Sequence, residues 1–219
     1  ANTDPVGAGS ILRSGVGARA LGMGGAFVGV ADNYSATYWN PAGITRTSSL
    51  YIGGMNQDKF GLGLNVNFIS GGLSLNTNNT HTSTISIPLI NKLAIAGTYN
   101  GFSTKIRAST ASGTSVGTIT YSERTYMGTT SLSISKLYSI GLTGKNYLFR
   151  APNVGVNGDT ATASGFGLDI GFLTTPLRNF SVGLAVFDFT GTPIKWRKTP
   201  TEPINIAPTR YSAGMGYEL

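Results

Sequence analysis

Apolar residues alternate with small or polar residues along most of the chain beyond residue 47. In the segment 60–68, FGLGLNVNF, the phenylalanines, leucines and valine share one face, whereas the glycines and asparagines share the other. The segments 165–172, GFGLDIGF, and 210–219, RYSAGMGYEL, follow the same rule. Successive side chains of a strand point to opposite faces, so each segment predicts a strand with one apolar face. With shorter segments of the same kind, the pattern predicts about nine or ten strands and almost no helix.

Two all-β architectures fit this alternation. A soluble sandwich turns its apolar faces into a core and its polar faces to water, whereas a membrane barrel turns its apolar faces to lipid. The second face here carries glycine, serine, alanine and asparagine, and only 11% of the chain is charged, against a usual share of about 25%. We therefore expect an antiparallel transmembrane β-barrel. The residues expected to face lipid are Leu62, Leu64, Val66, Phe166, Leu168, Ile170, Val182, Leu184 and Met215.

Loops and aromatic residues agree with this expectation. Long polar segments at 76–84, 109–124 and 150–164 contrast with tight links at 56–59 and 176–179, and aromatic residues recur near the strand ends. Outer-membrane barrels combine aromatic girdles with short turns on one side and longer loops on the other. The sequence thus predicts a protein of the bacterial outer membrane, in contact with outer-membrane lipid.

The most unusual stretch is 17–43, GARALGMGGAFVGVADNYSATYWNPAG. It lacks the strict alternation of the later strands, and its glycines let the backbone pass close to another element. Residues 34–39 predict a short helix that ends before Pro41, because the residue before a proline disfavours the helical region. We expect residues 17–43 to form a plug and not a wall strand, with Gly24 and Gly25 in close contact with the wall formed by residues 46–219. The plug and turn motif comprises Gly22, Gly24, Gly25, Asn40, Pro41 and Gly43.

Aromatic side chains are concentrated in the same stretch. The simplest interpretation is that they pack between plug and wall, because large apolar side chains beside small residues fill such a junction. The alternative is that they border a route for an apolar ligand. The residues concerned are Phe27, Tyr34, Tyr38 and Trp39.

The stretch 17–44 strongly resembles the N-terminal signature of PorV/PorQ proteins, within the wider FadL-like outer-membrane family, and 165–196 resembles that family's strand pair and following turn. The resemblance implies a FadL-type barrel with an N-terminal hatch, represented here by roughly residues 1–45 and the turn 40–43. FadL-like members carry hydrophobic molecules across the outer membrane, and PorV-like members receive cargo proteins in type IX secretion.

Strand number departs from the family pattern, because family barrels have about fourteen strands. The chain is therefore expected to be either incomplete at its C-terminus or a smaller barrel that closes by itself. Two functions follow: a conduit for small hydrophobic molecules, or a PorV-like docking component for secretion-machinery or other protein partners. The alternative is a soluble or surface all-β structural protein, such as a filament subunit.

Charge and composition argue against other classes. The net charge is +7, yet the basic residues are scattered beside apolar segments. They therefore indicate solvated strand ends or contacts with anionic lipid headgroups, and we expect no nucleic-acid partner. The chain has no cysteine and only one histidine, His81, in a polar loop. We expect no metal site, no cofactor and no enzymatic activity; Asp169 and Glu218 are expected in polar networks inside the barrel.

Overall fold

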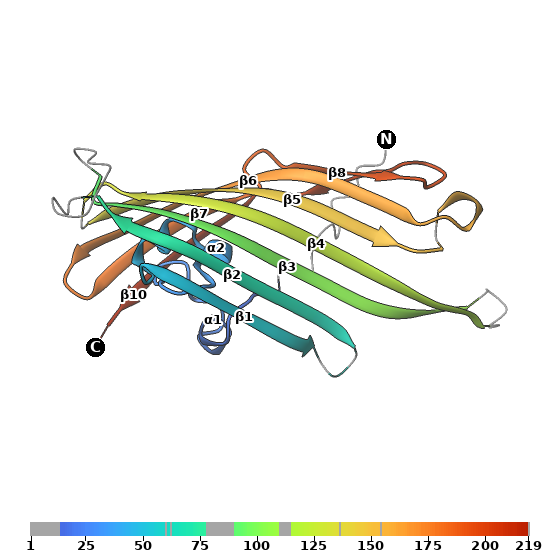
Figure 1. Ribbon diagram of the computed structural model, residues 1–219, viewed down its shortest axis with the longest axis horizontal. Coiled ribbons are helices and arrows are strands. Elements are labelled where there is room, and N and C mark those ends of the chain that lie inside the picture. The colour runs from blue at the N-terminus through green and yellow to red at the C-terminus, as the bar shows by residue number, and fades with distance from the viewer. Residues whose placement is uncertain are drawn as a thin grey trace.

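The computed structural model describes residues 14–59, 61, 63–77, 90–109, 115–135, 137–153 and 155–218. Within these residues the protein is mostly antiparallel β-sheet, curled into a half-barrel (Figure 1). The all-β prediction is confirmed. The strands are β1 (Leu50–Lys59), β2 (Leu64–Asn76), β3 (Lys92–Ser109), β4 (Ser115–Ser133), β5 (Tyr138–Ala151), β6 (Ala161–Leu177), β7 (Phe180–Phe187), β8 (Thr192–Arg197), β9 (Ile204–Ala207) and β10 (Arg210–Tyr217).

The sheet follows the order β1-β2-β3-β4-β5-β6-β7-β10, and β8 pairs with the other end of β6 and with β9. Within the described residues, β1 pairs only with β2 and β10 pairs only with β7. The described strands therefore do not close into a barrel by themselves, because β1 and β10 each keep one unpaired edge.

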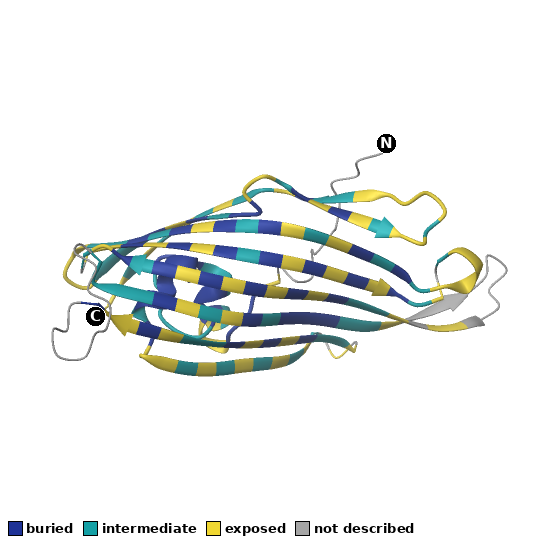
Figure 2. Ribbon diagram, turned by 45° about the horizontal axis from the view of Figure 1, so that its top comes forward, coloured by how far each residue is buried: buried dark blue, intermediate teal, exposed yellow. Residues whose placement is uncertain are grey.

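The segment before β1 is compact and lies on the concave side of the sheet (Figures 1 and 2). It contains α1 (Ala18–Gly22), α2 (Ala36–Trp39) and the 3₁₀ helix η2 (Pro41–Arg46). A further 3₁₀ turn, η3 (Val156–Gly158), precedes β6. None of the described helices is long and apolar enough to cross a bilayer. We call residues 14–47 the plug segment.

Burial alternates along the strands, as the period-two pattern predicts (Figure 2). On β5, Ser139, Gly141 and Thr143 are buried on the concave side, and Ile140 and Leu142 are exposed on the convex side. Most residues expected on the outer face lie there: Phe166, Ile170, Leu184 and Met215 are exposed, and Leu168 and Val182 are half-buried on the same face.

The predicted outward orientation is wrong for two residues, Val66 and Leu64. Val66 is 1% exposed and lies on the concave side, and Leu64 packs against the same core. Leu62 lies outside the described residues. On β2 the asparagines of the alternating pair, such as Asn67, face outward, and the apolar outer face begins only at Ile69. Near Ile69, the apolar residues of β2 change from the concave face to the convex face. The two-residue period alone does not reveal this change.

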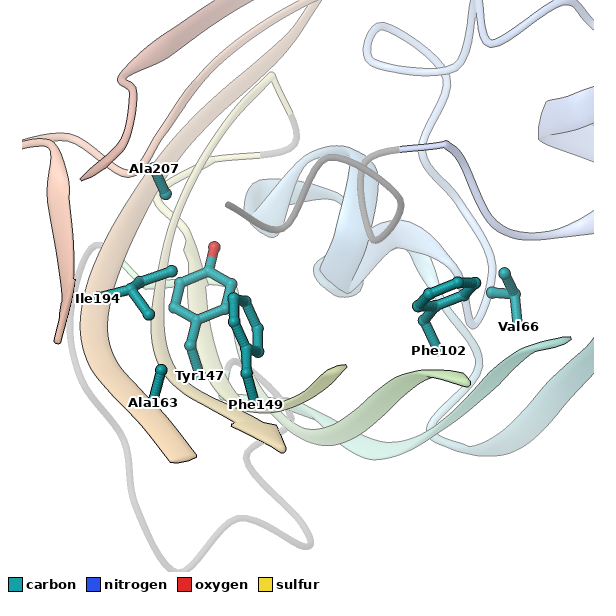
Figure 3. Close-up of a cluster of buried hydrophobic side chains, with 7 residues drawn as sticks. All are labelled: Val66, Phe102, Tyr147, Phe149, Ala163, Ile194 and Ala207. Atoms are coloured by element: carbon teal, nitrogen blue, oxygen red, sulfur yellow. The ribbon is translucent and has the colours of Figure 1, made fainter. Parts of the chain in front are cut away.

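The reason is an apolar core, separate from the packing around the plug segment, at the end of the half-barrel that carries β8 and β9. There the concave side is filled by side chains from β2, β3, β5, β6, β8 and β9 (Figure 3). The cluster comprises Val66, Phe102, Tyr147, Phe149, Ala163, Ile194 and Ala207. Apolar residues at this end therefore point inward, so their polar neighbours point outward.

Candidate functional site

Two glycines on neighbouring strands of the concave face make close contact with the plug segment. Gly141 on β5 and Gly171 on β6 are register partners. A Cβ atom at Gly141 would overlap the backbone of Pro41 and Ala42, and one at Gly171 would overlap the Asn40 side chain and the Pro41 ring. The turn 40–42 thus sits in a notch that exists because both strands lack a side chain there.

Asn40 connects the plug segment to the wall through its side chain. The residue is fully buried, and its Nδ2 donates to the carbonyl oxygen of Val28 at 2.9 Å and to that of Phe172 on β6 at 3.0 Å. Its Oδ1 accepts from the backbone N–H of Ala42 at 3.1 Å, which caps η2, and Pro41 occupies the first position of that helix. Asn40 therefore starts the helix and holds it against the sheet.

A second glycine pair receives the preceding part of the plug segment. Gly183 on β7 and Gly214 on β10 are register partners, and both lie against the backbone of Val28 and Gly29. Ser181 Oγ donates to the Gly29 carbonyl oxygen at 2.7 Å. The plug segment thus contacts the sheet from β1 to β10 through backbone as well as side chains.

Two arginine side chains of the plug segment are fixed by hydrogen bonds. Arg46 Nη2 donates to Thr175 Oγ1 at 2.5 Å, and burial lowers the pKa of its guanidinium group. Arg19 Nη1 lies 2.5 Å from Asp32 Oδ1, and this hydrogen bond raises the pKa of Arg19.

The expected glycine contacts are only partly correct. Gly22 and Gly24 are exposed, and a Cβ at either would meet nothing within 4 Å, so their expected close packing is wrong. Gly24 and Gly25 adopt φ values of +65° and +81°, and this left-handed turn, rather than the wall, explains the glycines. A Cβ at Gly25 would meet only the Trp39 ring, whereas one at Gly43 would overlap Ala31 within the plug segment.

The four aromatic residues are packed side chains. Phe27 is fully buried beside Trp39, whose Nε1 donates to the Val16 carbonyl oxygen at 2.8 Å. Tyr34 and Tyr38 both contact the Phe68 ring on β2. Their packing between plug and sheet agrees with the simpler interpretation.

A buried ionic cluster lies beyond the plug segment on the concave face. Lys145 Nζ on β5 lies 2.7 Å from Asp169 Oδ1 on β6 and 3.1 Å from Asp188 Oδ2 after β7. All three residues are at most 6% exposed. Asp188 also accepts from Tyr147 Oη at 3.0 Å and from Thr192 Oγ1 at 2.9 Å, and its N–H donates to Asp169.

Gly167 makes room for this cluster. A Cβ there would meet Thr192 Oγ1 at 2.5 Å and Asp188 Oδ1 at 2.6 Å. The sequence indicated Asp169 as a member of a polar network, which the structure confirms, but gave no sign that Lys145 and Asp188 would join it. Each of these two residues carries a charge within a strand or at a strand end, and many solvated residues occupy such positions as well.

The ionic cluster borders a cavity of about 40 Å³, together with Tyr38, Thr125 and Arg210. The cluster joins one ammonium group to two carboxyl groups, and among the described residues no group of three His, Cys, Asp or Glu side chains is placed to hold a metal ion. The arrangement anchors β5, β6, the segment after β7 and the start of β8 to one another. The chain was compared with models of known protein families, with characterised proteins and with solved structures, and no match was found.

Proposed function

We propose that the protein is a membrane-embedded β-barrel component of the bacterial outer membrane that keeps its interior closed and docks protein partners. The observation that carries the membrane part is an apolar belt on the convex face. One register row of this belt crosses seven strands: Leu75, Leu93, Leu132, Ile140, Phe172, Leu184 and Ala213.

A second row bounds the belt on the side of β8. It is formed mainly by aromatic side chains, with Tyr99 and Tyr126 5.4 Å apart between ring centres and Phe166 63% exposed. The row consists of Ile69, Tyr99, Tyr126, Asn146 and Phe166. Along β2, the two rows are separated by about 20 Å of strand. This is close to the roughly 25 Å apolar band, flanked by aromatic girdles, of outer-membrane barrels.

Beyond the aromatic row the outward side chains become polar, as with Asn67, Ser103 and Arg124. A soluble sandwich needs a second sheet over its apolar face. In the part of the chain that the structure describes, no element covers the belt, and Ile52, Tyr211 and Met215 are more than 70% exposed there. Contiguous exposed apolar surface of this kind marks a membrane or protein contact.

The filled concave side favours docking over a passage for hydrophobic molecules. The plug segment and the apolar clusters around Phe27, Phe68 and Phe102 occupy the concave side. The cavity beside Lys145 is about 40 Å³ and is lined by both polar and apolar side chains, whereas a cavity that takes up benzene measures about 150 Å³. The resemblance to PorV-like proteins also implies docking. In lipid, the unpaired edges of β1 and β10 would require further strands, because an open edge is not tolerated there.

The proposal is tested by expressing the protein in a Gram-negative host and washing the membranes with alkaline carbonate. We expect the protein to stay in the outer-membrane fraction and to enter the detergent phase of a phase separation. Recovery in the aqueous phase would instead support the soluble, filament-type alternative.

Docking and conduit functions are then separated with the purified protein in liposomes. We expect no uptake of a hydrophobic fluorescent tracer above empty liposomes, and a discrete protein partner after crosslinking in cells. A Gly171→Leu variant, which displaces the turn 40–42, reports whether the plug closes the interior, and Gly97→Leu on the outer face is its control. Tracer uptake by the unaltered protein would overturn the docking function in favour of a conduit.

A further inference from the structure

Four cationic side chains gather on the convex face just beyond the aromatic row. Arg124 on β4 and Lys195 on β8 lie in one register row, linked through Leu148 and Ser164. Arg150 and Arg197 lie in the next row, linked through Thr162. We call Arg124, Arg150, Lys195 and Arg197 the basic patch; β4, β5, β6 and β8 lie side by side at this end (Figure 1).

The patch is compact. Neighbouring strands are about 4.8 Å apart, so Arg150 and Arg197 are separated by about 10 Å of sheet, and Arg124 and Lys195 by about 14 Å. Alternation places all four side chains on the outer face, and each is exposed. Side chains of this length reach a common group from such positions.

Acidic residues do not neutralise the patch. None of its four residues takes part in an ion pair within the described part of the chain. Glu123, although next to Arg124 in sequence, is buried on the concave face. Asp159 pairs with Lys198 at 3.4 Å, and Glu202 lies in the turn between β8 and β9.

The position of the patch identifies its ligand. It lies on the lipid-facing side of the sheet, one row beyond exposed aromatic rings, which is where the headgroups of a bilayer meet an embedded protein. Arginine binds phosphate oxygens in a bidentate manner, and basic residues at a membrane surface attract anionic lipids. We propose that the basic patch binds the phosphate groups of anionic lipids in one leaflet. This inference rests on the proposed membrane location.

The test uses the full chain in lipid nanodiscs made of zwitterionic lipid with a minor share of phosphatidylglycerol. Lipids retained by the protein are counted by native mass spectrometry. We expect the preference for phosphatidylglycerol to fall about fivefold for each charge removed in Arg150→Gln and in the double variant Arg150→Gln/Arg197→Gln. Raised salt should weaken the preference of the unaltered protein.

The matched control is Arg178→Gln, at the turn between β6 and β7, where an exposed arginine lies outside the patch. It should keep the preference for phosphatidylglycerol. An equal fall in the control, or an unchanged preference in the double variant, would overturn the basic patch as the lipid site. Loss of the preference on adding inorganic phosphate at the concentration of the lipid would identify an ion site and overturn the lipid.

Each variant is checked for native circular dichroism and for incorporation into the nanodisc. Incorporation without any preference contradicts only the lipid inference. Failure of the unaltered protein to incorporate contradicts the proposed membrane function and the inference together.

Discussion

Gly171 lies where the turn 40–42 meets the sheet, so any side chain there must displace either the turn or the strand. We expect Gly171→Ala to lower the free energy of unfolding by about 1 to 3 kcal/mol, because the added methyl overpacks a filled notch. Denaturant unfolding in detergent or vesicles measures the change. Gly97→Ala is the matched control, since a Cβ at Gly97 on the outer face of β3 meets nothing within 4 Å. Equal losses in the two variants would contradict the notch.

Asn40 allows a sharper test, because its side chain both donates and accepts. Asn40→Ala leaves the Val28 and Phe172 carbonyl oxygens without this donor, at a cost of about 2 to 4 kcal/mol. Asn40→Asp keeps an acceptor for the Ala42 N–H but turns a carboxylate oxygen toward two carbonyl oxygens. We therefore expect Asn40→Asp to be the less stable variant. Tryptic cleavage after Arg46, which is half-buried in the folded protein, provides the readout. If the aspartate proved as stable as asparagine, the donor role would be wrong.

At the level of the elements, the buried pair of Lys145 and Asp169 joins β5 to β6. Asp188 links this pair to the start of β8. Lys145→Met should cost about 3 to 5 kcal/mol of unfolding free energy, because it leaves two carboxylates buried without their cation. Adding Asp169→Asn and Asp188→Asn should restore part of that loss. Equilibrium unfolding measures both.

The exposed pair of Lys198 and Asp159 supplies the comparison. Lys198→Met should change the unfolding free energy by less than about 1 kcal/mol, because exposed ion pairs contribute little. A Lys145→Met loss of the same small size would mean that the buried cluster does not hold the strands together.

Strand periodicity could be read from the sequence, but the direction of each face could not. The alternation in 165–172 and 210–219 predicted β6 and β10 and their outward residues correctly. On β2 the same rule assigned Val66 to the outside, because nothing in one strand reports that a second core fills the concave side at that end. The close approaches at Gly141 and Gly183 depend on plug residues about 100 and 155 positions earlier in the chain, and Lys145 meets carboxylates 24 and 43 positions later. The predicted wall contact of Gly24 is wrong because a left-handed turn and a close packing contact both favour glycine, and the sequence does not distinguish them.

For the whole molecule, the solvent of the convex face is the decisive property. In a bilayer, Ile95→Arg near the middle of the belt should cost about 2 to 4 kcal/mol. On a water-exposed surface the same change should stay within about 0.5 kcal/mol. Unfolding in phospholipid vesicles measures the cost, and Asn67→Arg, beyond the aromatic row, should be nearly neutral. A neutral Ile95→Arg would contradict the membrane belt.

The glycine notches that contact the plug segment also affect the order in which parts of the chain can fold. The plug segment precedes all the described strands in the chain, yet its notches are formed by Gly141, Gly171, Gly183 and Gly214, and the Ser181–Gly29 hydrogen bond spans 152 residues. Tyr34 and Tyr38 contact Phe68 on the early strand β2, but the backbone of Val28 and Gly29 has no partner until β7 and β10 have been made. Contacts of such long sequence separation form slowly, and exposed apolar segments aggregate in the meantime. The part of the plug segment around Val28 and Gly29, although early in the chain, is thus among the last to reach its place in the fold.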